Sequence, residues 1–147
     1  MAWDGRKGEP TMLNLPKRIY IKEVGPRDGL QIEKTFVPTA TKIEMIDRLS
    51  QCGFADIQSA AFVHPKAVPN MADAEKVLAG ITRQPGVEYS ALVPNLRGFQ
   101  RAAAAGVKRV ELTLSATDSH NINNMNMTTE QSIKMIEQCL NSGLDVD

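Results

Sequence analysis

The segment EVGPRDGLQ at positions 23–31 places a cation and a carboxylate side by side among glycines and a proline. Arg27 and Asp28 could act on a ligand through their charges if both side chains face a cavity. The simpler interpretation is a Pro/Asp/Gly turn, in which Arg27 is solvated and Asp28 bonds its own backbone. Residue types and spacing alone favour the turn.

The elements around this segment alternate between two patterns. Short β-rich runs predict strands at 18–24, 54–61, 87–93 and 108–114. Helical patterns follow them at 38–53, 72–81, 96–105 and 128–142, with glycine closing three of the four. Parallel α/β folds place their chemistry in the loops after strands, and residues 23–31 lie at the end of the first one.

This alternation predicts parallel strands joined by right-handed crossovers, either in an open doubly wound sheet or in a barrel. Four βα units are present, and LDVD at 144–147 has the pattern of a fifth strand that has just begun. We therefore expect a flexible leader over residues 1–17 and a truncated α/β domain over residues 18–147.

Composition excludes several classes of function. Seventeen Lys and Arg balance seventeen Asp and Glu, so bulk charge gives no reason to expect a nucleic-acid partner or an anionic membrane surface. No apolar run approaches the roughly 20 residues that span a bilayer. The first 17 residues resemble neither a signal peptide nor a transit peptide. We expect a cytoplasmic protein that binds no nucleic acid and no membrane.

Five motifs together point to one family. They are EVGPRDGLQ (23–31), FVHPKAVPNM (62–71), PNLRGF (94–99), SATDSHN (115–121) and NMN (124–126). This set resembles the 3-hydroxy-3-methylglutaryl-CoA lyases, within the TIM-barrel metallolyases and Claisen-type condensing enzymes. The resemblance runs from Lys17 to the C-terminus, and it implies a (β/α)8 TIM barrel. This chain would hold the first four βα units and the start of strand five.

The resemblance also implies roles for individual residues. Asp28 would be a ligand of a divalent cation, Mg²⁺ or Mn²⁺, because a carboxylate suits a hard ion. Arg27 would stabilise the enolate oxyanion with its fixed fork of donors. Glu23 would be a catalytic residue that helps to order the site, and Gln31 would support substrate binding.

The implied reaction is a retro-Claisen cleavage of a branched hydroxyacyl-CoA into acetyl-CoA and acetoacetate, with no organic cofactor. The partner would be a small acyl-CoA, and the full-length enzyme would be a homo-oligomer. His120 follows the fourth predicted strand and is a candidate substrate contact, with a loop role equally open.

Two departures from the family pattern stand out. Members usually carry Glu at the position of Gln58, and an amide can serve neither as a base nor as an anionic ligand. Gln58 is therefore a candidate substrate contact with an altered role. The family's His-x-His metal ligands and its loop cysteine would lie beyond Asp147, so the chain alone is expected to be inactive.

Two other functions remain open. A condensing acyltransferase of the same superfamily would make the carbon bond instead of breaking it, although those enzymes usually carry Thr-Leu-Arg-Asp-Gly where this chain has Gly-Pro-Arg-Asp-Gly. A half-barrel without catalytic activity is the non-enzymatic alternative.

Overall fold

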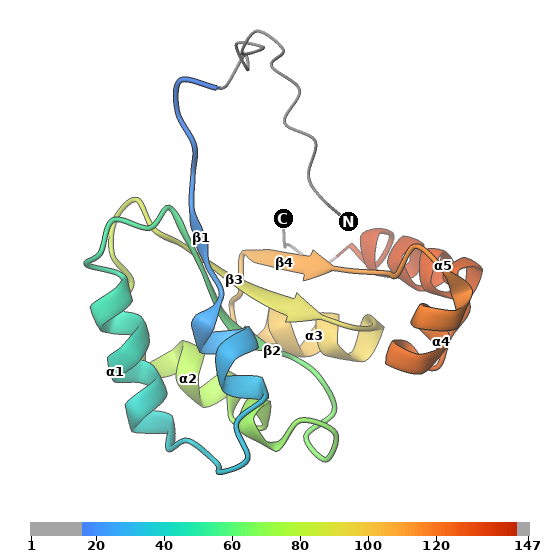
Figure 1. The fold of residues 1–147 in the computed structure, drawn as a ribbon, viewed down its shortest axis with the longest axis horizontal. Helices are drawn as coiled ribbons and strands as arrows, with labels where there is room; N and C mark the ends of the chain where they lie inside the picture. Colours follow the sequence, from blue (N-terminus) through green and yellow to red (C-terminus); the bar gives the residue numbers. More distant parts are fainter. Residues whose placement is uncertain (1–15, 144–147) are drawn as a thin grey trace, which may run out of the picture.

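The computed structural model describes residues 16–143. Four parallel strands lie in the order β1-β2-β3-β4, and helices connect them along the chain (Figure 1). The strands are β1 (Lys22–Glu23), β2 (Asp56–Ala61), β3 (Glu88–Val93) and β4 (Arg109–Leu112). The helices are η1 (Gly25–Gly29), α1 (Thr39–Leu49), η2 (Pro69–Met71), α2 (Ala74–Gly80), α3 (Leu96–Ala104), α4 (Asp118–Met125) and α5 (Thr129–Leu140). Parallel strands paired in chain order are the predicted arrangement of half a (β/α)8 barrel.

Local sequence signals set the starts of the helices. The Asn95 side chain accepts a hydrogen bond of 2.9 Å from the Gly98 backbone N–H and so caps α3. Thr128 and Gln131 form the predicted capping box at the start of α5, with both reciprocal bonds present. Among residues 16–143 there is no helix whose length and apolarity would let it cross a bilayer.

One face of the sheet packs against α1, α2 and α3, which lie below the strands in Figure 1. Ile57 on β2 and Ala91 and Val93 on β3 are fully buried in this layer. Ile46 of α1 and Phe99 of α3 pack into the same core. Because side chains alternate along a strand, this apolar face leaves the residues between these positions for the opposite face.

That opposite face, here called the inner face, is polar. It carries Lys22, Asp56, Gln58, Ser90 and Glu111, whose positions follow from the strand registers. Branched apolar residues usually fill the interior of such a barrel. Charged residues here must therefore be paired with one another.

The pairing shows that the sheet is curved. Lys22 Nζ lies 2.9 Å from Asp56 Oδ2 on the neighbouring strand and 2.5 Å from Glu111 Oε1 on β4. β1 and β4 are the two edges of the described sheet, roughly 14 Å apart if the sheet were flat. The ion pair between Lys22 and Glu111 spans those edges across a concave face, and a strand layer that closes into a barrel needs that curvature.

Three expectations need correction or fall outside the structure. The first strand was predicted over residues 18–24 but comprises only Lys22–Glu23, because its partner β2 begins at Asp56 and leaves residues 18–21 nothing to pair with. Helix α4 lies where the sequence predicted neither a helix nor a strand. The expected leader up to residue 15 and the fifth strand at 144–147 lie outside the described residues.

Candidate active site

The motif after β1 forms one π-helical turn, η1, which changes the direction of the chain at the strand end. The Val24 carbonyl accepts hydrogen bonds from the N–H groups of Arg27, at 3.0 Å, and Asp28, at 2.7 Å. Two successive residues thereby bond the same carbonyl. The turn lets two neighbours, which on a strand would point to opposite faces, bring their side chains together.

Glu23 orders this turn from the helix side of the sheet. Its Oε1 accepts a hydrogen bond of 2.6 Å from the Gly25 N–H. A Cβ placed on Gly25 would lie 2.9 Å from that same oxygen. Only a residue without a side chain allows this approach, so Glu23 and Gly25 form a unit. Glu23 thus contacts the backbone of the motif, and in the structure it positions the turn.

Arg27 lies at the centre of the site, with 16% of its side chain exposed. Its Nε donates to Gln58 Oε1, and its Nη1 forms an ion pair with Asp28 Oδ1. Gln31 Nε2 lies 3.4 Å from the same Asp28 oxygen. Four residues that the sequence singled out are therefore brought together by two adjacent strand ends.

Gln58 occupies the inner face of β2 and is 1% exposed. It stands in register with Ser90, and one extra residue in β2, Ser59, shifts the register directly after it. The bulge interrupts the regular pairing directly after the residue whose side chain meets Arg27, and the pairing resumes at Ala60. The amide oxygen of Gln58 serves the guanidinium, which explains why this buried polar group is tolerated.

A cavity of about 620 Å³ opens beside Arg27. Arg27 and Gln31 line one side, and the end of β3 contributes Leu92. The lining also includes polar amides at the end of α4 and just after it, namely Asn123, Asn124 and Asn126. Asn126 adopts a left-handed conformation with φ of 54° that closes α4. The cavity therefore combines one guanidinium with several neutral hydrogen-bonding groups.

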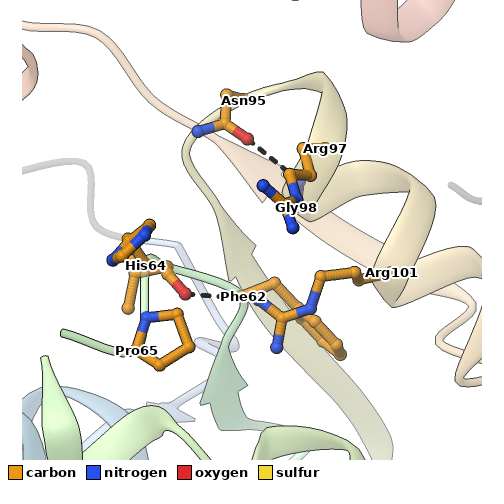
Figure 2. Close-up of a pocket in the computed structure, with 8 residues that line it drawn as sticks. Phe62, His64, Pro65, Asn95, Arg97, Gly98 and Arg101 are labelled. Atoms are coloured by element: carbon orange, nitrogen blue, oxygen red, sulfur yellow. Dashed lines mark hydrogen bonds between the residues drawn. The ribbon is translucent and has the colours of Figure 1, made fainter. Parts of the chain in front are cut away.

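A second cavity of about 300 Å³ adjoins the first, and His64 and Asn95 line both. Figure 2 shows that Arg97 and Arg101, from the first turns of α3, face the segment that carries His64 and Pro65. Arg101 is held by Glu75, at 2.7 Å, and by the Val63 carbonyl, at 3.3 Å. This cavity is basic and suits an anionic group.

His120 lies outside both cavities. It is exposed on the first turn of α4 and lines neither one. The unpredicted helix α4 accounts for this placement, because it directs Asn123 and Asn124 toward the cavity instead. The structure thus brings Arg27, Asp28, Gln31 and Gln58 together and leaves His120 apart.

The donor set can be tested against a divalent cation. The Asp28 side chain is 56% exposed, and its oxygens are of the type that Mg²⁺ and Mn²⁺ prefer. Within residues 16–143, however, no three His, Cys, Asp or Glu side chains gather into a metal-binding group. Asp28 is thus a suitable type of ligand for a divalent cation. It is only one ligand, however, and one ligand is too few to hold the ion.

Asn70 is a supporting residue that the sequence did not reveal. It is 4% exposed, and its amide bonds the backbone of the loop between η1 and α1 in three places: the Val37 N–H at 2.8 Å, the Glu33 carbonyl at 2.8 Å and the Thr35 carbonyl at 3.2 Å. It lies in the motif FVHPKAVPNM at 62–71, but nothing in that motif indicates which backbone groups its amide bonds. It fixes the chain that leads away from Arg27 and Asp28.

Comparison with known proteins decides the family. The sequence model of the HMGL-like family matches residues 18–143. This chain belongs to the HMGL-like family. A rat protein, "Hydroxymethylglutaryl-CoA lyase, mitochondrial", is 47% identical over 127 residues, which are 86% of this chain and 39% of the relative. A mouse protein, "3-hydroxy-3-methylglutaryl-CoA lyase, cytoplasmic", is 42% identical over 146 residues, or 99% of this chain and 43% of the relative.

Solved structures of the HMGL-like family agree with the fold. The hydroxymethylglutaryl-CoA lyase of Pseudomonas aeruginosa superposes with a TM-score of 0.84 at 43% identity, covering 88% of this chain and 43% of that one. An HMG-CoA lyase from Acinetobacter baumannii, solved in complex with coenzyme A and 3-methylmalate, gives a TM-score of 0.81 at 45% identity and covers 86% and 43%. The chain thus spans about two fifths of the length of these relatives.

Proposed function

We propose that this chain provides the first half of the active site of a 3-hydroxy-3-methylglutaryl-CoA lyase. The observation that carries the proposal is the contact of Arg27 with both Asp28 and Gln58 at the strand ends, beside a cavity of about 620 Å³. The lyase names of the relatives favour cleavage over the condensing reaction of the same superfamily.

In the proposed reaction, a base removes the proton of the tertiary alcohol of the substrate. The C–C bond breaks, acetoacetate departs as the ketone, and the electron pair passes to the thioester of the nascent acetyl-CoA. Arg27 faces the cavity with a side chain held from two directions, so it can meet the developing enolate oxygen without reorganising. The role of Arg27 in this scheme is electrostatic.

Asp28 would contribute one carboxylate ligand to Mg²⁺ or Mn²⁺, with further ligands from other residues of the protein. When bound, such an ion polarises the substrate oxygens as a Lewis acid. Asp28 has the exposure that this role needs, since more than half of its side chain faces solvent. Gln31, which lies against the same carboxylate oxygen, would orient it.

The two adjoining cavities suit an acyl-CoA. The larger one, with its amides, would hold the acyl and thioester groups, and the basic one, with Arg97 and Arg101, would receive a phosphate of coenzyme A. The complex of the Acinetobacter relative with coenzyme A supports this choice of ligand. A cytoplasmic location is part of the proposal and has support from the mouse relative, whereas the rat relative is named mitochondrial.

The direct test is release of acetyl-CoA from 3-hydroxy-3-methylglutaryl-CoA by the full-length protein that carries these residues, titrated with Mg²⁺ and with Mn²⁺. We expect cation-dependent cleavage, abolished by a chelator and restored by the ion. If acetyl-CoA and acetoacetate were instead joined, or if neither reaction occurred, the lyase assignment would be wrong.

A further inference from the structure

The inner face contains a continuous chain of polar contacts that ends at Arg27. Lys22 Nζ on β1 binds Glu111 on β4 at 2.5 Å. Gln58, on β2 between these two strands, is near enough to the Glu111 carboxyl to lower its pKa by hydrogen bonding. Gln58 Oε1 then accepts from Arg27 Nε. A path from Lys22 through Glu111 and Gln58 to Arg27 therefore connects the two edges of the sheet with the site, and its one neutral group, Gln58, lies between an anion and a cation.

The amide at position 58 fits between an anion and a cation. Its NH₂ group can only donate, and it meets the Glu111 carboxylate; its carbonyl oxygen can only accept, and it meets the guanidinium of Arg27. A carboxylate at position 58 would still accept from Arg27, but it would have no proton to offer Glu111. Two unprotonated carboxylates in contact repel each other, and one of them resists ionisation.

The electrostatics around Glu111 agree with this arrangement. Burial alone would raise the pKa of the Glu111 carboxyl, but the hydrogen bonds from Lys22 and Gln58 outweigh it and hold that pKa below its ordinary value. Glu111 is thus anionic at neutral pH. The other charged groups nearby are Asp56, which also binds Lys22, and Arg109, whose Nη1 lies 3.8 Å from Asp56.

We propose that Glu111 and Lys22 are positioning residues that act on Arg27 through Gln58, and that the Glu111 carboxylate is the reason an amide occupies position 58. The part that concerns turnover rests on the proposed function. The part that concerns the coupling of positions 58 and 111 does not. It makes the two positions interdependent, so a change at one should be compensated by the complementary change at the other.

A double-mutant cycle in the full-length protein tests this coupling. Gln58→Glu should lower the midpoint of thermal unfolding by several degrees at pH 8, because it sets two carboxylates against each other. Adding Glu111→Gln should restore the midpoint to near that of the parent, since the donor and acceptor have then changed places. The matched control is Glu88→Gln, which removes a carboxylate from the same face of the sheet but from a residue that pairs with Arg109, whose Nε lies 3.7 Å from Glu88 Oε2. When Glu88→Gln is combined with Gln58→Glu, the midpoint of thermal unfolding should stay as low as in Gln58→Glu alone.

Kinetics then report on the positioning of Arg27. We expect Gln58→Glu to lower kcat by about tenfold, with KM changed by less than about twofold, and Glu111→Gln to recover kcat in the double variant. If Gln58→Glu does not fold, the same comparison is made between its two double variants, of which only the one with Glu111→Gln should fold.

Equal rescue by Glu88→Gln and Glu111→Gln would overturn the proposal, because it would show a general charge effect. An unfolding midpoint of Gln58→Glu equal to that of the parent would do so as well. If the parent protein had no lyase activity, the proposed function would be wrong instead. The double-mutant cycle measured by thermal unfolding would still test whether positions 58 and 111 are coupled.

Discussion

Arg27 and Asp28 are neighbours in the sequence, and their side chains form an ion pair with each other at the end of β1. On a regular strand they would point to opposite faces of the sheet. The π-helical turn η1 removes that restriction, because the Val24 carbonyl accepts from both of their N–H groups. In the proposed function, Asp28 would bind the cation and Arg27 would stabilise the developing negative charge.

Asp28→Asn should weaken binding of Mn²⁺ by the full-length protein by about tenfold or more, because an amide replaces an anionic ligand. The fold should change little, since the Asp28 side chain is more than half exposed. Metal titration monitored by calorimetry gives the affinity, and far-UV circular dichroism checks the fold. Mn²⁺ affinity equal to that of the parent would remove Asp28 from the ligand set.

Gly25→Ala should destabilise the protein by about 1–2 kcal/mol, because the new methyl group would lie 2.9 Å from Glu23 Oε1 and would break the contact that orders η1. Gly29→Ala is the matched control in the same turn, because no atom lies within 4 Å of its added Cβ. Denaturant unfolding of both variants makes the comparison. Equal losses would mean that close approach at Gly25 is unimportant.

The paired charges of the inner face predict a pH dependence of stability. The folded-state pKa of Glu111 lies below its ordinary value, so its contribution is present at neutral pH and is lost as pH falls through that folded pKa. For Lys22, burial alone would lower the pKa, but hydrogen bonds to Asp56 and Glu111 raise it. The contribution of Lys22 is therefore present at neutral pH and is lost as pH rises through its folded pKa.

Glu111→Gln should accordingly flatten the loss of stability on the acid side, as measured by unfolding free energies from pH 7 down to pH 3. Asp118, whose pKa is lowered by hydrogen bonds from Thr129, is exposed and is not among the groups that lower the pKa of Glu111, so its own acid dependence should persist in that variant. If the unfolding free energy of Glu111→Gln fell between pH 7 and pH 3 as steeply as that of the parent, the lowered pKa of Glu111 would not contribute to stability.

Much of the fold could be predicted from the sequence, because alternating strand and helix patterns and the capping box at Thr128 are local signals. The inner-face position of Gln58 follows from the period of two along β2. Helix α4 was missed because its sequence, DSHNINNM, is polar and carries little helical periodicity. The length of β1 depends on where its partner strand begins, and no local pattern contains that information.

The roles of the candidate site residues stay predictions, and the contacts among these residues could be predicted only in part. EVGPRDGLQ identified Arg27, Asp28 and Gln31, whereas the bond between Arg27 and Gln58 joins positions 31 residues apart. The pair of Lys22 and Glu111, which are 89 residues apart, depends on the curvature of the sheet. The alternation within KRVELTL at 108–114 could have placed Glu111 on the inner face, but it could not have named its partners.

The most direct test of the account is the turnover of Arg27→Lys on 3-hydroxy-3-methylglutaryl-CoA in the full-length protein, with Mn²⁺ affinity measured on the same sample. A lysine keeps the charge but cannot reproduce the planar, fixed fork of donors with which Arg27 binds Gln58 and Asp28. We predict that kcat falls by roughly 10²- to 10³-fold, as when one oxyanion donor is removed, while Mn²⁺ affinity stays near that of the parent. Full turnover by Arg27→Lys would contradict the account.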